Sequence, residues 1–157
     1  FLFLWRRYAA LLRNKLAVIG LRLQELFTAA PHALLRAEHP LAGRASVTLK
    51  DLQPYLRLNF LQGNYESADF SEEPFSTVFA EKEIRVSDRA AIVNLMIGLD
   101  EYTISTGIFP EYLQGRQIIS VPLAEQETMH IGYVLCKEQG LSSLGRIYVN
   151  ALKKYAR

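Results

Sequence analysis

The chain has 157 residues, of which 50% are hydrophobic and 22% are charged, and its formal net charge is +2 at pH 7. This size and composition predict one folded domain, or two small lobes that share a core, rather than a disordered chain. The small net charge gives little support for a nucleic-acid surface, and no apolar run approaches the roughly 20 residues of a membrane span. The single cysteine, Cys136, excludes an internal disulfide framework and a cysteine-rich zinc site, and it fits a reducing compartment.

The first two predicted elements are a buried strand at residues 1–4 and a helix. The apolar residues of the helix recur every three or four positions, which is typical of one helix face; they are Trp5, Tyr8, Ala9, Leu12, Leu16 and Ile19. Gly20 follows where a helix usually ends. The opposite face is basic, with Arg6, Arg7, Arg13 and Lys15. Such a face can bind a membrane or nucleic acid, but a solvated surface helix is the favoured interpretation.

Two extended segments follow, at residues 22–28 and 31–37, separated by Ala30-Pro31. Pro40 then removes a backbone donor and fixes φ, so the second segment must end or leave its sheet there. Thr48 is predicted to cap a short helix, because Asp51 lies at the spacing of a capping box. The chain is therefore expected to leave one sheet and to start a new structural unit after Pro40.

The remaining elements alternate between strands and helices. Strands are predicted at residues 55–61, 84–86, 102–105, 117–121 and 128–137, and helices at residues 71–80, after Ser87 and Asp88, and after Ser142. The last helix carries an apolar stripe of Leu144, Ile147, Tyr148, Ala151, Leu152 and Tyr155. The alternation predicts an α/β fold with a largely parallel sheet.

No catalytic motif is recognisable in the sequence. The three histidines lack metal-ligand spacing, and there is no P-loop, dinucleotide fingerprint or nucleophile elbow. Cys136 lies in an apolar strand and is interpreted as core packing. The acids Glu66, Asp69, Glu72 and Glu73 could supply a general acid and base, but the last two fit the first turn of a helix better. The chain is therefore predicted not to be an enzyme and to need neither a cofactor nor a metal.

Three polar segments at the ends of predicted strands suggest a binding site instead. These segments are Gln62-Gly63-Asn64, Ser87-Asp88-Arg89 and Thr103 to Gly107. In open α/β sheets such loops line the ligand crevice, and helix N-termini there favour anions. The residues expected to contact a ligand are Gln62, Asn64, Ser87, Arg89, Ser105 and Thr106.

Several motifs occur in the order found in one protein family. They are His39-Pro40-Leu41-Ala42-Gly43 with Val47-Thr48-Leu49-x-Asp51-Leu52, Ser87-Asp88-Arg89, Gly98-Leu99, Thr103–Ile108 with Pro110, Ile119-x-Val121-Pro122-Leu123, Ile131-Gly132-Tyr133 and Leu141-Ser142. Together, over residues 1–155, they resemble the effector-binding domain of LysR-type transcriptional regulators. The His-Pro-Leu-Ala segment and its following helix are the most specific part of this resemblance.

The resemblance implies a periplasmic-binding-protein-like fold with two α/β lobes, joined by two crossing strands around a small-molecule cleft. Residues 1–39 and 127–157 would form a truncated first lobe with the crossover strands, and residues 40–126 a complete second lobe with its own mixed sheet. The strand before His39-Pro40 would be the first crossover and residues 128–137 the return. The final helix would pack on the first lobe.

Two departures from the family pattern matter. The chain starts at Phe1 without a helix-turn-helix or linker helix, so an N-terminal segment is expected to be missing, together with most of the first lobe. The usual Gly-x-Gly-Ile-x-x-x-Pro segment is also replaced by the variant at residues 99–108.

The function implied is that of a cytoplasmic ligand sensor for transcription regulation. Its partners would be a small-molecule effector, with an anionic metabolite favoured, and a second copy in a homodimer. DNA would be bound only through the missing N-terminal domain, and no membrane is expected. The alternatives are a free-standing solute-binding protein of the same fold and a small enzyme that uses Cys136 or the acidic cluster.

Overall fold

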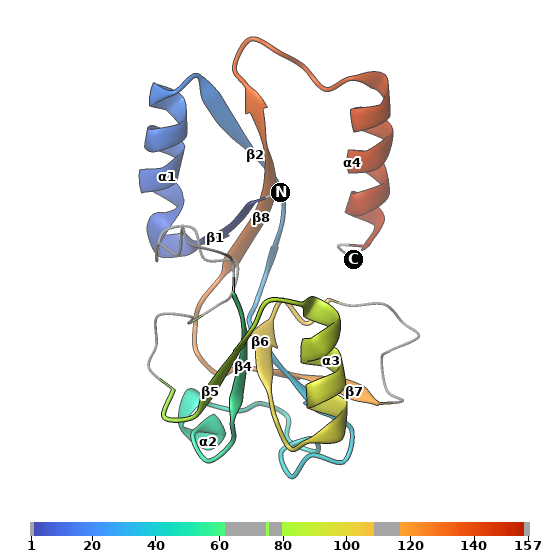
Figure 1. The fold of residues 1–157 in the computed structure, drawn as a ribbon. Helices are drawn as coiled ribbons and strands as arrows, with labels where there is room; N and C mark the ends of the chain where they lie inside the picture. The colour runs from blue at the N-terminus through green and yellow to red at the C-terminus, as the bar shows by residue number, and fades with distance from the viewer. Residues whose placement is uncertain (1, 62–74, 76–79, 109–116, 156–157) are drawn as a thin grey trace.

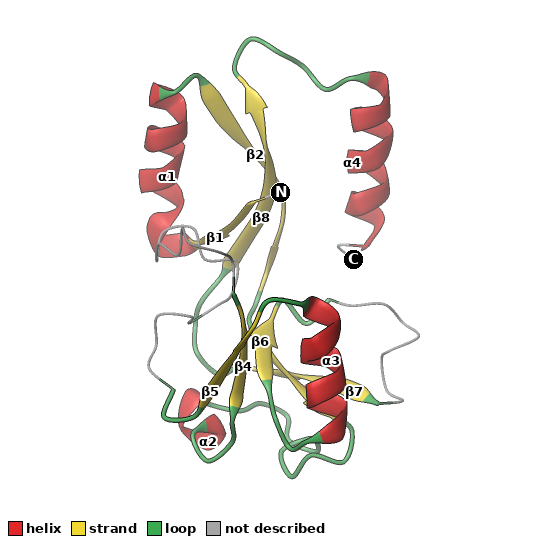
Figure 2. Ribbon diagram, in the orientation of Figure 1, coloured by secondary structure: helices red, strands yellow, loops and turns green. Residues whose placement is uncertain are grey.

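The computed structural model describes residues 2–61, 75, 80–108 and 117–155, and these form an upper and a lower part in Figures 1 and 2. The upper part contains residues 2–29 and 129–155, and the lower part contains the described residues between them. The elements are β1 (Leu2–Trp5), α1 (Arg6–Val18), β2 (Leu21–Ala29), β3 (His32–Arg36), α2 (Leu49–Leu52), β4 (Arg57–Phe60), β5 (Glu83–Val86), α3 (Arg89–Gly98), β6 (Thr103–Ser105), β7 (Ile118–Pro122), β8 (Met129–Cys136) and α4 (Ser143–Tyr155). Every described strand and helix lies within a few residues of its predicted position, whereas the helix predicted at residues 71–80 falls largely outside the described residues.

The upper part is built on an antiparallel sheet of three strands in the order β1-β8-β2. Helix α1 covers it through an apolar cluster whose members are Leu12, Leu16, Leu21, Leu23 and Val134. Gly20 ends α1 with a φ of +75°, which only glycine adopts without strain, and this confirms its predicted place. Helices α1 and α4 lie on opposite sides of the β2 and β8 strands (Figure 1).

The lower part contains the mixed sheet expected of the second lobe, whereas the alternation of strands and helices alone predicted a largely parallel sheet. Strand β3 pairs antiparallel with β6 on one side and with β7 on the other, while β4 and β5 pair parallel. A bridge between Arg57 and Tyr102 joins the two groups, so the strand order is β5-β4-β6-β3-β7. The parallel prediction is wrong because alternation along the chain does not reveal that β3 enters from the upper part and runs against its neighbours.

Strands β2 and β8 connect the two parts. They pair along their length, from Leu21 opposite Cys136 to Ala29 opposite Met129. Beyond Ala29 the chain passes Pro31 and enters β3, whose ladder partners are β6 and β7. The predicted boundary at residues 39 and 40 would assign β3 to the first lobe, although β3 pairs with strands of the lower part. We therefore propose that the crossover strand is β2 and that the boundary between the lobes lies at residues 30 and 31.

The largest core cluster extends from the lower sheet to the lower ends of the connecting strands. Its buried members include Ala33, Leu35, Ile104, Val121, Met129 and Ile131, and the partly buried Phe27 and Ala29 pack against it. A second cluster, centred on Leu58, Ile92, Met96 and Ile118, holds α3 against the sheet. The ends of β2 and β8 therefore share a core with the part of the molecule that they enter.

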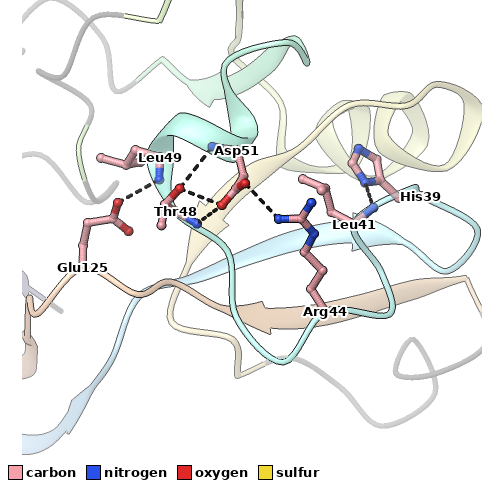
Figure 3. A network of polar contacts seen from close by, with 7 residues as sticks. All are labelled: His39, Leu41, Arg44, Thr48, Leu49, Asp51 and Glu125. Atoms are coloured by element: carbon pink, nitrogen blue, oxygen red, sulfur yellow. Dashed lines mark hydrogen bonds and ion pairs between the residues drawn. The ribbon is translucent and has the colours of Figure 1, made fainter.

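The segment between β3 and α2 is fixed by local hydrogen bonds (Figure 3). The Leu41 N–H donates to His39 Nδ1 at 3.1 Å, which tightens the turn around Pro40. The predicted capping box of α2 is confirmed: the Asp51 N–H donates to Thr48 Oγ1, and the Thr48 N–H donates to an Asp51 oxygen. The pKa of Asp51 is lowered, first of all because the Thr48 hydroxyl donates to its carboxylate.

The upper part exposes residues of the apolar stripe of α4 and also Cys136, which was predicted to pack in the core. Leu144, Ile147 and Tyr148 of α4 are exposed, whereas their neighbour Val149 is buried, so a different face of the helix turns toward the protein. Cys136 is exposed because it is the last residue of β8, opposite Leu21 at the end of the ladder. Periodicity identified an apolar stripe correctly but could not show which face has a partner.

Candidate functional site

A cavity of about 230 Å³ lies where α3 and β6 meet the lower end of β8. Its lining residues are Leu34, Arg89, Ile92, Val93, Met96, Thr103, Ile104, Ser105, Thr106 and Met129. Met129 is the first residue of β8 and pairs with Ala29, the last residue of β2. The cavity therefore lies at the border between the lower part and the two connecting strands.

Arg89 reaches the cavity because Asp88 fixes the start of α3. The Asp88 side chain accepts hydrogen bonds from the N–H groups of Ala90 at 3.3 Å and Ala91 at 3.0 Å, which makes Asp88 the N-cap. Arg89 is then the first helical residue. Its guanidinium carbon lies 4.1 Å from the centre of the Phe60 ring, a distance at which a cation is attracted to the ring face.

The N-terminus of α3 is less open to a ligand than the sequence predicted. We expected its backbone N–H groups to be donors for an anion, but those of Ala90 and Ala91 already donate to Asp88. The Asp88 carboxylate thus occupies the position where an external anion would gain from the helix dipole. The positive charge at the cavity therefore comes from the Arg89 side chain rather than from the N-terminus of α3.

The hydroxyl groups of the cavity come from β6 and the turn that follows it. Thr103 and Ser105 are two positions apart on β6, so they share one face of the strand. Thr106 Oγ1 accepts from the Ile108 N–H at 3.2 Å, which fixes the turn, and a hydroxyl that accepts can still donate its own hydrogen. The Thr106 side chain is therefore held in place before any ligand binds.

Gly107 is needed for the packing of the turn after β6. In the structure its φ is +75°, and a Cβ there would lie 2.7 Å from both His32 Cγ and Ser120 Oγ. The residue must therefore be glycine because the turn packs on β3 and β7, and that packing positions Ser105 and Thr106.

The structure brings together three of the six residues predicted to contact a ligand. Arg89, Ser105 and Thr106 line the cavity, whereas Ser87 is exposed and is not part of the lining. Gln62 and Asn64 lie outside the described residues. Their role in binding an effector stays a prediction.

Sequence reasoning missed most of the apolar lining. Leu34 comes from β3, Met129 comes from β8, and Ile92, Val93 and Met96 come from α3. Thr103 was detectable, because strand alternation places it on the same face as Ser105. The apolar residues carry no such signal, since their patterns are those of ordinary core residues.

A second cavity, of about 310 Å³, lies between α2, the start of β4 and the residues that precede β5 and β6. It is lined by Leu49, Lys50, Gln53, Tyr55, Arg57, Ala80, Glu81 and Tyr102. The Arg57 side chain is buried, and its Nη1 donates to the Phe75 carbonyl at 2.7 Å. Burial raises the pKa of Tyr102, although nearby Arg57 opposes the shift. This internal contact of the buried Arg57 fits a structural role.

Neither cavity has the composition of a metal site. Within residues 2–61, 75, 80–108 and 117–155, no group of three His, Cys, Asp or Glu side chains could hold a metal ion. None of the helices in the same residues is long and apolar enough to cross a membrane.

Comparison with solved structures identifies the fold. HinK, a LysR-family transcriptional regulator from Pseudomonas aeruginosa, has a TM-score of 0.57 and 18% identity, with 87% of this chain and 48% of HinK covered. OxyR in its reduced form has a TM-score of 0.59 and 18% identity, with 88% of this chain and 66% of OxyR covered. The effector-binding domain of QuiR in complex with shikimate has a TM-score of 0.55 and 19% identity, with 88% of this chain and 64% of that chain covered.

The chain therefore has the fold of the effector-binding domain of LysR-type regulators, which confirms the predicted α/β, periplasmic-binding-protein-like class. It spans between about half and two thirds of the length of these three proteins. No family model matches the sequence. No curated protein sequence is significantly similar to it.

Proposed function

We propose that this chain is the small-molecule-sensing region of a LysR-type transcriptional regulator. The observation that carries the proposal is the cavity of about 230 Å³, in which Arg89, Ser105 and Thr106 of the lower part meet Met129 of a connecting strand. A concave, mostly apolar site with a few convergent polar groups is the usual form of a small-molecule site. The fold shared with effector-binding domains, one of them in complex with shikimate, supports the same assignment.

The position of the cavity supports a sensing role. A ligand there would contact Met129, which pairs with both Trp5 of β1 and Ala29 of β2. Contact with this strand can favour one arrangement of the two parts over another, and a ligand shifts such an equilibrium by its difference in affinity for the two states. We propose that this shift is the signal passed to the rest of the regulator.

The properties of the whole regulator belong to the same proposal. DNA would be bound by an N-terminal helix-turn-helix domain, the protein would act as a homodimer, and it would work in the cytoplasm. The region would be a sensor rather than an enzyme. The resemblance and the fold support these four statements together, because all of them are features of LysR-type regulators.

A thermal-shift screen of small metabolites of every charge class tests the proposal on the 157-residue chain. A ligand that binds only the folded state raises the melting temperature, and the increase grows with the logarithm of its concentration once this exceeds Kd. We expect at least one compound to stabilise the chain reproducibly. If no class of compound has an effect, the chain is not a small-molecule sensor.

A further inference from the structure

The second cavity, of about 310 Å³, lies toward the other end of the lower sheet from the cavity proposed for sensing. Strand β4 runs parallel to β5, and the bridge between Arg57 and Tyr102 is parallel too. The first cavity includes Ser105 and Thr106, at the end of β6, whereas the second is lined by Tyr102, which precedes β6. Its described lining residues all belong to the lower part. A ligand in the second cavity would therefore occupy a separate site.

The Tyr102 side chain supplies a buried polar group to this cavity. The residue is only 4% exposed, and no hydrogen bond joins its hydroxyl to another of the described residues. Burial raises the pKa of Tyr102, so the hydroxyl keeps its proton at neutral pH and can both donate and accept. A buried hydroxyl of this kind gains a hydrogen bond from a ligand without losing one to the protein.

Two exposed side chains of opposite charge line the same cavity. Lys50 belongs to α2, and Glu81 to the segment before β5. Neither forms an ion pair with another of the described residues. Arg57 also lines the cavity, but it is buried and donates to the Phe75 carbonyl, so we assign it no contact with a ligand. The charges that remain for a ligand are one ammonium group and one carboxylate.

We propose that the second cavity binds a free α-amino acid with an apolar side chain. Lys50 and the Tyr102 hydroxyl would bind its carboxylate, and Glu81 would bind its ammonium group. A molecule with only one of these charges would leave Lys50 or Glu81 without a new partner. This site goes beyond the proposed sensing function, which depends on the first cavity, and it would give the region a second small-molecule ligand.

The size and the remaining lining of the cavity favour an apolar side chain on the amino acid. A cavity of about 150 Å³ accommodates benzene, and this one is large enough at about 310 Å³ to hold the charged groups as well. Leu49, Ala80 and the ring of Tyr55 supply apolar surface. The Tyr55 ring packs on His39, with 4.3 Å between the ring centres. Leucine and phenylalanine match this lining.

Probes that differ in charge but share a similar body test the proposal. They are L-leucine, L-phenylalanine, 3-phenylpropanoate, which lacks the ammonium group, and 2-phenylethylammonium, which lacks the carboxylate. Each is titrated into the 157-residue chain while backbone amide resonances are followed by NMR. We expect both amino acids to shift resonances of residues 49–57, 80–83 and 101–102. Each analogue should bind about ten-fold or more weakly than L-phenylalanine, because it loses one charge-assisted contact.

Two variants assign each charge of the ligand to its partner. Glu81→Gln should remove the preference for L-phenylalanine over 3-phenylpropanoate. Lys50→Gln should remove the preference for L-phenylalanine over 2-phenylethylammonium. Glu138→Gln and Lys153→Gln are the matched controls, because they neutralise exposed charges of the upper part that do not line the cavity. Circular dichroism confirms that each variant is folded.

Tyr102→Phe separates a binding role of the hydroxyl from a structural one. The change should weaken binding of L-phenylalanine about five-fold, the effect of one hydrogen bond. Without a ligand it should not lower the unfolding free energy, because the hydroxyl has no hydrogen bond to another described residue. Tyr133→Phe in β8, outside the lining, is the control and should leave binding unchanged.

The proposal is wrong if neither amino acid binds at millimolar concentration, or if either analogue binds as tightly as L-phenylalanine. It is also wrong if Glu81→Gln and Lys50→Gln keep both preferences. Shifts confined to residues 89–96, 103–106 and 129–131 would place the amino acids in the first cavity, which overturns the proposal and leaves the sensing function intact. A loss of stability in ligand-free Tyr102→Phe would contradict the role given to the hydroxyl.

Discussion

At the scale of single residues, the candidate site depends on side chains whose positions are set by neighbours. Arg89 is held by its stacking on Phe60, and Thr106 by its bond from the Ile108 N–H. Groups fixed in this way lose little further conformational entropy when a ligand binds, so more of the free energy of each contact contributes to affinity. Removal of the hydroxyls, or of the guanidinium, should therefore weaken ligand binding measurably.

Removal of the two hydroxyls of the turn should weaken ligand binding without unfolding the chain. For a compound found by the thermal-shift screen, Ser105→Ala with Thr106→Ala should cost about 1–3 kcal/mol of binding free energy if each residue loses a buried hydrogen bond. Calorimetric titration of the variant measures the loss. Ser46→Ala in an exposed loop is the control, and an unchanged affinity in a folded double variant would exclude this turn from the site.

His39 should make the stability of the protein depend on pH. Its side chain is buried, its ring centre lies 4.3 Å from that of Tyr55, and its Nδ1 accepts from the Leu41 N–H. Burial lowers the pKa of His39 below 6.5; the Asp100 carboxylate opposes this effect and Arg36 adds to it. The folded state therefore favours the neutral ring, so its contribution to stability is complete above pH 6.5 and is lost as the pH falls through the depressed pKa.

Urea unfolding between pH 7.5 and 5 tests this effect of His39. The unfolding free energy should decrease as the pH falls, and it should decrease less in His39→Gln, whose side chain can still accept from the Leu41 N–H but does not titrate. Parallel pH profiles for the two proteins would show that His39 does not contribute.

At the scale of secondary-structure elements, local features were predictable and pairing was not. The capping box of Thr48 and Asp51, the Asp88 cap of α3 and the Ser142 cap of α4 depend on residues two or three positions apart, so the sequence reveals them. The direction of β3 depends on strands about 70 to 90 residues away in the chain. Its neighbours, and the place where the connecting strand ends, could not be predicted from local patterns.

The residues of the candidate site also divide into some that the sequence predicts and others that it does not. Ser105, Thr106 and Arg89 follow strands or begin a helix, and such positions are recognisable from turn and cap residues. Met129 and Leu34 reach the cavity only because β8 and β3 meet the same end of the sheet. Their sequence patterns indicate burial and nothing about which space they face.

The turn after β6 should be sensitive to any side chain at Gly107. Gly107→Ala requires a φ that costs a non-glycine residue about 1–3 kcal/mol, and its Cβ would also collide with His32 and Ser120. Chemical denaturation should show this loss of unfolding free energy. Gly43→Ala is the matched control, because its Cβ would have no atom within 4 Å, and equal effects of the two changes would contradict the account of this turn.

At the scale of the whole molecule, the exposed apolar groups lie mainly in the upper part. Val18, Ile19, Leu144 and Ile147 have exposed fractions of 86%, 68%, 78% and 66%. Exposed apolar side chains on α4 and at the end of α1 favour association. The expected homodimer and non-specific association both predict that the chain does not stay monomeric.

Sedimentation velocity at increasing concentration should therefore show self-association. Leu144→Gln with Ile147→Gln should reduce it, because both side chains belong to the exposed face of α4. Leu99→Gln, which replaces an exposed leucine at the end of α3, should have little effect and serves as the control. A protein that stays monomeric at high concentration would exclude both the homodimer and non-specific association.

The central claim is that a small molecule binds where α3, β6 and the start of β8 meet. Hydrogen exchange of the 157-residue chain, with and without a compound found by the thermal-shift screen, tests it most directly. The account predicts slower exchange at the amides of residues 89–96, 103–106 and 129–131, with Met129 and its neighbours linking the site to the connecting strands. Protection confined to the second cavity, around Lys50, Tyr55 and Ala80, would contradict the claim.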